Sequence, residues 1–342
     1  MYEPYYRFSA KPFQLSPDPR FFYESRVHKR AYAYLEYGLF QGEGFIVITG
    51  EVGAGKTTIV RNLLSHLNPS QVVAAHLVST QLDADDLLRS VATSFGLTAK
   101  GTDKASLLAE LERFLRQLTG EKKRALLIVD EAQNLTARAV EELRMLSNFQ
   151  AGDRALLQSF LVGQPELRRI LRAPDMQQFR QRIIASYHLG PLDRGETEAY
   201  IQHRLKHVGW VGNPKLENDV YDAIFAFTAG IPRRINLVAN RLLLAGYLNE
   251  KHVLRGSDVE EVAKEMSEEL GGAALSVDST ADGGRTDVAA VQKESPEPER
   301  TTWPLSTDEG AASLLPRIIR LEKALARVLG LLKQATQNAE LV

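Results

Sequence analysis

Gly50-Glu51-Val52-Gly53-Ala54-Gly55-Lys56-Thr57 decides the fold of this chain. It fits the pattern G-x-x-x-x-G-K-[ST] and directly follows the apolar run 45–49. Glycines let backbone N–H groups wrap a phosphate. Residues 59–67 carry apolar side chains at helical spacing, so a helix beginning near Lys56 would add the positive end of its dipole. A strand, a glycine loop and a helix in this order predict a phosphate-binding loop rather than a chance match in a turn.

The residue types of this loop predict a site for ATP and Mg²⁺. Lys56 supplies a mobile positive charge for the β- and γ-phosphates, and the Thr57 hydroxyl is suited to ligate Mg²⁺. The predicted nucleotide-binding residues are Gly50, Glu51, Val52, Gly53, Ala54, Gly55, Lys56, Thr57 and Thr58.

A second nucleotide motif is the apolar run 125–129, which ends in Asp130 and Glu131. A continuous apolar run is typical of a parallel strand that is buried on both faces. Ligands of open α/β sheets bind at the carboxyl ends of such strands, where Asp130 would hold Mg²⁺ through water. Glu131 would orient and polarise the attacking water. Such a run is weak evidence alone, but together with the phosphate-binding loop it strongly indicates a Walker B strand.

Further alternation of strands and helices predicts an α/β domain over residues 1–190. Besides 45–49 and 125–131, the pattern predicts strands over 72–78, 157–162 and 184–189, and helices over about 27–41, 104–119 and 136–149, with a further helix capped by Asp83. Gln164 follows a strand. Its amide would either hydrogen-bond the γ-phosphate or the attacking water, or have a role only in the turn. His76 has no metal-ligand companions nearby in the sequence, so we expect a structural role.

The first 26 residues are rich in aromatic side chains and proline. Two interpretations stay open for residues 1–26. They form an extended segment that its rings pin to the core, which spacing alone favours, or they form part of the wall around the adenine base.

From residue 191 onward the pattern predicts helices only, over about 193–207, 217–229, 232–248 and 256–269. This change marks a domain boundary near 191 and an all-α domain over 191–270. Pro232 suits the first turn of a helix, and Arg233 follows it. An exposed basic first turn is disfavoured by the helix dipole, which favours a role for Arg233 near the nucleotide.

The remaining residues predict a linker and a last helix. Residues 271–313 have the composition of a disordered linker. Residues 314–342 repeat apolar side chains at spacings of four and three and carry basic residues, which predicts an amphipathic helix. Such a helix would self-associate, bind a protein partner or lie on an anionic membrane surface.

Composition narrows the class of protein. The chain has 342 residues, 44% of them hydrophobic and 25% charged, with a net charge of −1. This near-neutral charge disfavours nucleic acid as a partner, although a local basic ring in an oligomer would escape that count. The chain has no cysteine, which excludes disulfides and thiol catalysis. Without a secretion signal or a sufficiently long apolar run, we expect a cytoplasmic protein, peripheral at most to the inner face of the membrane.

These residues together resemble the AAA+ ATPases over about residues 1–270. Within them, Pro12-Phe13, Phe21-Phe22-Tyr23, His28 and the stretch 49–53 resemble the ExeA/GspA-type secretion ATPases. Among these, the sequence most resembles the ATPases associated with PEP-CTERM/exosortase (XrtA) exopolysaccharide loci. The resemblance implies a parallel five-stranded sheet flanked by helices, followed by an all-α lid domain. It also implies a homo-oligomeric ring, such as a hexamer.

The resemblance also implies roles for four polar side chains. Gln164 falls at the sensor-1 position, where many AAA+ proteins carry Asn or Thr. Arg182 matches the arginine finger that reaches the γ-phosphate of a neighbouring subunit, with Arg180 as the fallback. Both arginines have a plainer interpretation as solvated cations at a helix end. Arg233, in Gly-x-Pro-Arg, matches the sensor-2 arginine of the lid.

Three hypotheses for function follow. The first is Mg²⁺-dependent ATP hydrolysis coupled to assembly or export of exopolysaccharide or secreted proteins. The second is an ATP-switched DNA-binding regulator, because similar AAA+ modules serve DNA transposition. The third is a scaffold for a membrane machine in which hydrolysis sets only the timing.

Overall fold

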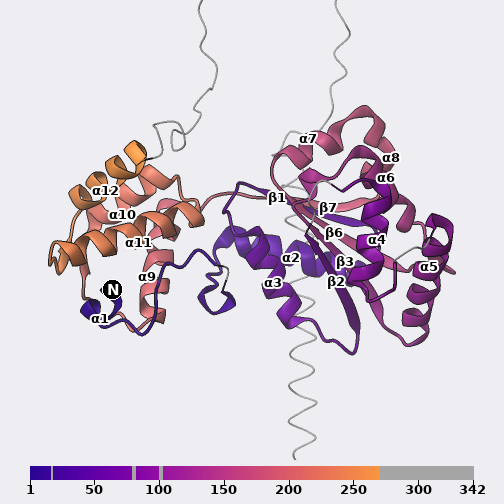
Figure 1. Ribbon diagram of the computed structural model, residues 1–342, viewed down its shortest axis with the longest axis horizontal. Coiled ribbons are helices and arrows are strands. Elements are labelled where there is room, and N and C mark those ends of the chain that lie inside the picture. The colour runs from indigo at the N-terminus through magenta and orange to yellow at the C-terminus, as the bar shows by residue number, and fades with distance from the viewer. Residues whose placement is uncertain (17, 79–81, 100–102, 270–342) are drawn as a thin grey trace, which may run out of the picture. The chain divides into compact units, whose positions relative to one another are not determined.

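A computed structural model describes residues 1–16, 18–78, 82–99 and 103–269 (Figure 1). The predicted linker over 271–313 and the predicted helix over 314–342 lie outside the described residues. Within the part of the chain that is described, no helix is both long and apolar enough to span a membrane.

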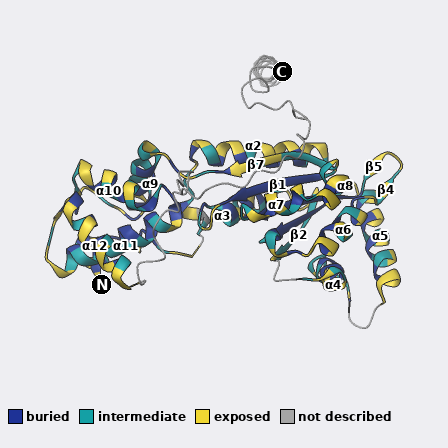
Figure 2. Cartoon of the chain, turned by 90° about the horizontal axis from the view of Figure 1, so that it is seen from above, coloured by how far each residue is buried: buried dark blue, intermediate teal, exposed yellow. Residues whose placement is uncertain are grey.

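A parallel five-stranded sheet is the centre of the α/β part, in the order β2-β3-β6-β1-β7. Its strands are β1 (Phe45–Gly50), β2 (Val72–Val78), β3 (Arg124–Asp130), β6 (Leu157–Gly163) and β7 (Ile183–Leu189). Every residue of β1 is buried, as the dark blue arrow in Figure 2 shows. Strands that are covered on both faces need continuous apolar sequence, which is why the pattern revealed them. The predicted five-stranded parallel sheet is confirmed.

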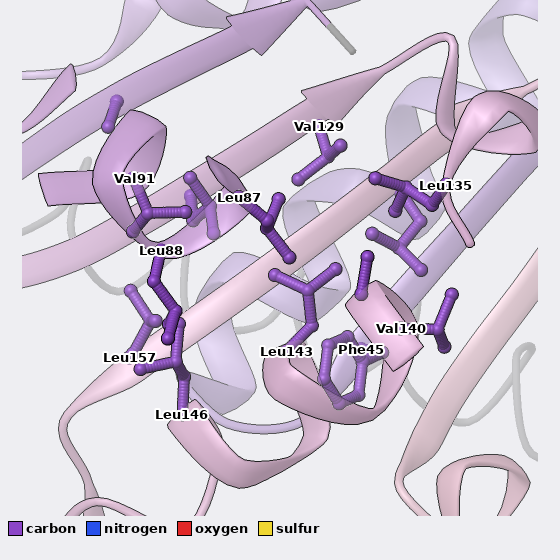
Figure 3. Close-up of a cluster of buried hydrophobic side chains, with 14 of the residues drawn as sticks. Phe45, Leu87, Leu88, Val91, Val129, Leu135, Val140, Leu143, Leu146 and Leu157 are labelled. Carbon is purple, nitrogen blue, oxygen red and sulfur yellow. The ribbon is translucent and has the colours of Figure 1, made fainter. Parts of the chain in front are cut away.

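Two hydrophobic clusters cover the two faces of this sheet, because alternate side chains of a strand point to opposite faces. On one face, Phe45 and Val129 pack with Leu87, Val91 and Leu143 (Figure 3). On the other face, the cluster contains Ile46, Ile48, Leu35, Ile59 and Val60, among others.

The helices of the α/β part include one whose N-terminal cap, Asp83, the sequence predicted. They are α2 (Arg26–Gln41), α3 (Lys56–His66), α4 (Ala84–Ser94), α5 (Lys104–Gly120), α6 (Ala137–Leu146), α7 (Glu166–Arg172) and α8 (Gln177–Arg180). The Asp83 carboxylate accepts a hydrogen bond from the Asp86 backbone N–H at 2.9 Å, so the predicted cap is present. A two-stranded antiparallel ribbon, β4 (Gln150–Ala151) with β5 (Arg154–Ala155), joins α6 to β6.

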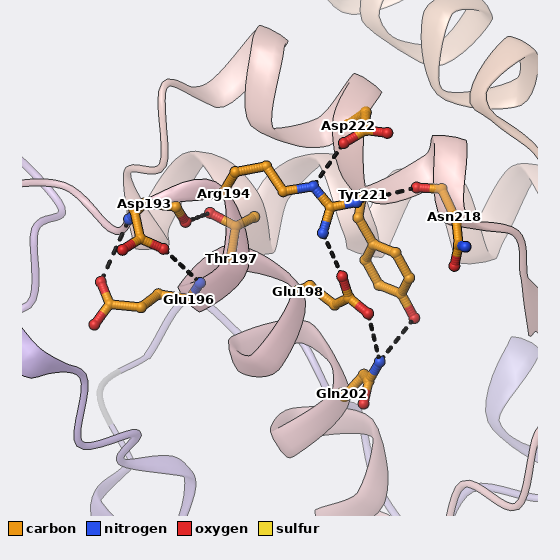
Figure 4. Close-up of polar contacts among 9 residues, drawn as sticks. All are labelled: Asp193, Arg194, Glu196, Thr197, Glu198, Gln202, Asn218, Tyr221 and Asp222. Carbon is orange, nitrogen blue, oxygen red and sulfur yellow. Dashed lines mark hydrogen bonds and ion pairs between the residues drawn. The ribbon is translucent and has the colours of Figure 1, made fainter.

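The helical part contains α9 (Arg194–His207), α10 (Asn218–Thr228), α11 (Pro232–Leu248) and α12 (Gly256–Glu269). A capping box of Asp193 and Glu196 begins α9, and Arg194 bonds to Glu198 and to Asp222 of α10 (Figure 4). The expectation of helices only was wrong for four residues. They form β8 (Lys215–Leu216) and β9 (Val253–Leu254), which pair in parallel and are too short to show a strand period.

The N-terminal segment packs with this helical part. Its rings at Tyr2, Tyr6, Phe8, Phe13 and Phe21 are buried in the cluster that contains the apolar side chains of α9 to α12. The expectation of an extended segment was wrong for α1 (Tyr2–Tyr6), where two buried tyrosines lie one helical turn apart. The expectation that rings hold the segment in place is met by this packing.

Candidate functional site

The loop between β1 and α3 needs glycine at two positions. Gly53 and Gly55 have φ angles of +84° and +101°, in the left-handed region. A Cβ atom on Gly53 would lie 2.3 Å from Cβ of Arg233, and one on Gly55 would lie 2.6 Å from Nε2 of His28. The loop is therefore held between His28 on α2 and Arg233 on α11.

Lys56 begins α3 and is only 6% exposed. Its Nζ donates hydrogen bonds to the carbonyl oxygens of Gly50 at 2.7 Å and Glu51 at 3.0 Å. Burial lowers the pKa of Lys56, and the carboxylates of Glu131 and Asp130 oppose that effect. The ammonium is thus held inside the loop by backbone oxygens that carry no full charge.

The two predicted metal ligands are in contact. Thr57 Oγ1 donates to Asp130 Oδ2 at 2.9 Å, and Asp130 is 2% exposed. Among the residues that the structure describes, no group of three or more His, Cys, Asp or Glu side chains forms a metal cluster. A hydroxyl and a single carboxylate fit Mg²⁺, because this ion prefers oxygen ligands and keeps several waters or phosphate oxygens in its shell.

His76 lies beside this pair, which the sequence did not indicate. Its Nε2 is 3.9 Å from Asp130 Oδ2 and has no hydrogen-bond partner in the structure. The two side chains meet because β2 and β3 are neighbours in register over their whole length. Their proximity is therefore a consequence of sheet order, which sequence spacing does not give.

Glu131 follows β3 with a left-handed φ of +52°, and two amides hold its carboxylate. Its Oε2 accepts hydrogen bonds from Gln133 Nε2 at 2.6 Å and from Gln164 Nε2 at 3.3 Å. The Gln164 backbone N–H also donates to Gln133 Oε1 at 2.9 Å. The structure thus brings the predicted Gln164 to Glu131, and it adds Gln133, which we did not predict. The only sequence signal for Gln133 was its position two residues after Glu131.

A cavity of about 210 Å³ opens over the loop. From the loop and the predicted catalytic set it is lined by Val52, Gly53, Gly55, Lys56, Thr57, Thr58, Glu131, Gln164 and Arg233. The N-terminal segment also contributes to the lining, through Gln14, Leu15, Ser16, Asp18, Phe21, Phe22 and Tyr23. The two interpretations of this segment are therefore compatible, since it both buries its rings and forms a wall of the cavity.

The three predicted arginines lie in different places. Arg233 lines the cavity from the first turn of α11, and its backbone N–H donates to Gly53 O at 3.2 Å. Arg182 precedes β7, and its guanidinium donates to Ser147 O at 3.1 Å. Arg180 donates to the carbonyl oxygens of Leu171 and Ala173. Neither Arg180 nor Arg182 lines the cavity of its own chain.

His28 is a further contributor that the spacing did not identify. Its Nδ1 lies 2.6 Å from Ser25 Oγ, and burial lowers its pKa to about 4. Since a neutral imidazole is favoured there, His28 supports the loop beside Ala54 and Gly55 without adding positive charge. Tyr200, Arg204 and Asn236 also line the cavity from the helical part, and none of them was predicted.

Residues 39–171 match the family model described as the AAA domain. The described residues have the AAA+ P-loop fold, as predicted. General secretion pathway protein A of Aeromonas hydrophila is 38% identical to the chain over 268 residues, which are 78% of this chain and 49% of that protein. The chain therefore spans about half the length of this curated relative.

Solved structures share the fold of the AAA domain and the helices that follow it. Cdc6p from Pyrobaculum aerophilum has a TM-score of 0.57 at 17% identity, over 73% of this chain and 70% of that one. The Aeropyrum pernix ORC2 protein, in ADPNP–ADP complexes, has a TM-score of 0.54 at 19% identity, over 73% of this chain and 70% of that one. The Aeropyrum pernix ORC1 protein in complex with DNA has a TM-score of 0.55 at 15% identity, over 76% of this chain and 70% of that one. At these identities the likeness shows the fold alone.

Proposed function

We propose that this chain is a Mg²⁺-dependent ATPase that acts as a homo-oligomer. The observation that carries the proposal is the 2.9 Å contact between Thr57 and Asp130 beside a buried Lys56, in a cavity that Glu131 also lines. Helix α3 and strand β3, which are far apart in sequence, thus supply the hydroxyl, the ammonium and the carboxylate that a nucleoside triphosphate requires.

The residues of the site suit in-line attack of water on the γ-phosphate. Thr57 and Asp130 would hold Mg²⁺, which when bound neutralises charge on the phosphate oxygens. Lys56 would exchange its carbonyl partners for phosphate oxygens, which are stronger acceptors. Glu131 would orient the water and accept its proton, while Gln164 and Gln133 fix the direction of its carboxylate.

Two arginines would also contact the γ-phosphate. Arg233 would act as the sensor-2 residue from its own chain, since it already lines the cavity. Arg182 would act as the finger of a neighbouring copy, as the sequence resemblance implies, and it does not line the cavity of its own chain. We therefore propose that residues 191–270 form a lid and that hydrolysis depends on assembly into a ring.

We infer that the ATP cycle serves export or assembly of secreted proteins or exopolysaccharide. The similarity to General secretion pathway protein A supports secretion, and the sequence resemblance supports a PEP-CTERM/exosortase-type locus. On this proposal the protein is cytoplasmic and peripheral to the inner face of the membrane, and the segment 314–342, for which the sequence predicts a helix, binds a protein partner or the membrane surface. Exosortase and polysaccharide genes beside this one would support the assignment, and a neighbouring transposase would favour the DNA-binding alternative.

The experiment on the hydrolytic step uses Glu131→Gln, with Glu36→Gln on the exposed side of α2 as the matched control. Glu131→Gln keeps the amide contacts but removes the base, so phosphate release should fall by roughly 10²- to 10⁴-fold while ATP still binds. The control should hydrolyse ATP at the wild-type rate. Normal turnover by Glu131→Gln would contradict the role of Glu131.

A further inference from the structure

A buried arginine without an acidic partner lines the cavity. Arg204 lies on α9, is 5% exposed and is part of the cavity lining. In the described part of the chain no carboxylate pairs with it, and its Nε has no hydrogen-bond partner. Its NH1 donates to the Tyr200 hydroxyl at 2.6 Å, and that hydroxyl donates to Asn236 Oδ1 at 2.8 Å.

The surroundings of this guanidinium are aromatic. Its central carbon lies 4.9 Å from the centre of the Phe21 ring and 5.5 Å from that of Tyr200. Cation–π contacts compensate only part of the cost of burying an unpaired charge. A buried donor that is left without an acceptor adds a further cost. A ligand that brings a hydrogen-bond acceptor to this end of the cavity would remove that cost.

The chemistry of the lining suggests which part of a nucleotide that ligand presents. The N–H groups of the loop and Lys56 would bind the phosphates. Arg204 instead lies among the rings of Phe21 and Tyr200, and aromatic rings suit a flat base. The adenine ring offers nitrogen atoms that accept hydrogen bonds. We propose that Arg204 is a specificity-determining residue that donates to a ring nitrogen of the adenine base. This inference rests on the proposed ATPase function.

The N-terminal segment takes part in this subsite. Phe21 contacts the guanidinium, and Phe22 and Tyr23 continue the same wall. Tyr23 also packs edge-to-face on Tyr200, with ring centres 5.9 Å apart. The base would therefore lie between the segment and α9, and Arg204 would be the charged donor in an otherwise aromatic setting.

The test compares Arg204→Met with wild type for two probes in the presence of Mg²⁺, ATP and inorganic tripolyphosphate, which lacks the base. Methionine keeps an apolar stem and removes every donor. The affinity of Arg204→Met for ATP should fall about 10- to 100-fold, as expected for the loss of a hydrogen bond from a charged group. Its affinity for tripolyphosphate should stay within about twofold of the wild-type value. Arg113→Met, at an exposed position on α5, should bind both probes normally. Equal losses for both probes, or no loss for ATP, would overturn the proposal.

A second measurement uses only the wild-type chain and so does not depend on the variant folding. ATP is compared with its 1-deaza, 3-deaza and 7-deaza analogues, each of which replaces one ring nitrogen with a C–H group. At least one analogue should bind ten times more weakly, and equal binding of all three would overturn the role of Arg204. Absence of ATP binding by wild type would instead refute the proposed function itself, so the two failures are distinguishable.

Discussion

Replacing Gln133 by methionine should slow ATP hydrolysis without weakening ATP binding. Gln133 donates to the Glu131 carboxylate at 2.6 Å and accepts from the Gln164 backbone at 2.9 Å, so methionine removes both contacts at similar length. A hydrogen bond to a charged group is worth about 1.5–3 kcal/mol. At about 1.4 kcal/mol for each factor of ten, kcat should fall roughly 10- to 100-fold. The Kd for ATP should change little, because Gln133 does not line the cavity.

The assay is steady-state phosphate release together with calorimetric titration of ATP. Gln117→Met, on the exposed side of α5, is the matched control and should behave as wild type. In a Glu131→Gln background, Gln133→Met should add little further loss, because the carboxylate that it positions is already absent. An unchanged kcat, or a loss of ATP affinity as large as the loss of kcat, would refute this reasoning.

Three further predictions concern the finger, the loop support and the loop itself. Arg182→Ala should lose about 10³- to 10⁵-fold in hydrolysis with ATP affinity unchanged, and normal phosphate release at high protein concentration would contradict that role. Burial lowers the pKa of His28 to about 4 from 6.5, so the unfolded chain takes up the proton first as pH falls. The free energy of unfolding should therefore drop by about 3 kcal/mol between pH 7 and pH 4, and urea titrations of His28→Gln should show a flatter pH dependence. Gly53→Ala should weaken ATP binding at least tenfold by calorimetry, because of its positive φ and the 2.3 Å approach to Arg233, whereas Gly120→Ala, with open space around it, should bind normally.

Local patterns were sufficient to predict the sheet and the charged centre of the site. The loop before Lys56 and the carboxylates after β3 each occupy a few consecutive residues, so their chemistry can be read without knowledge of tertiary contacts. The long apolar strands were visible for the same reason. The pairing of β8 with β9 could not be predicted, because a strand of two residues cannot show a period.

The supporting side chains could not be predicted, because they reach the site from distant elements. His28 comes from α2 and resembles an ordinary core histidine in sequence. Arg204 and Tyr200 come from α9, where spacing shows only a helix that packs on its neighbours. His76 meets Asp130 only because β2 lies next to β3. The fold thus sets which polar side chains share the cavity, and spacing within one element does not.

The central claim is that a nucleoside triphosphate binds at the loop through Lys56 and a Mg²⁺ ion. Calorimetric titration of ATP with Mg²⁺ into wild type, Lys56→Ala and the exposed control Lys29→Ala tests it most directly. Wild type and the control should bind ATP with the same affinity, and Lys56→Ala should bind at least ten times more weakly because a charged hydrogen bond is lost. No binding by wild type, or equal binding by Lys56→Ala, would contradict the account.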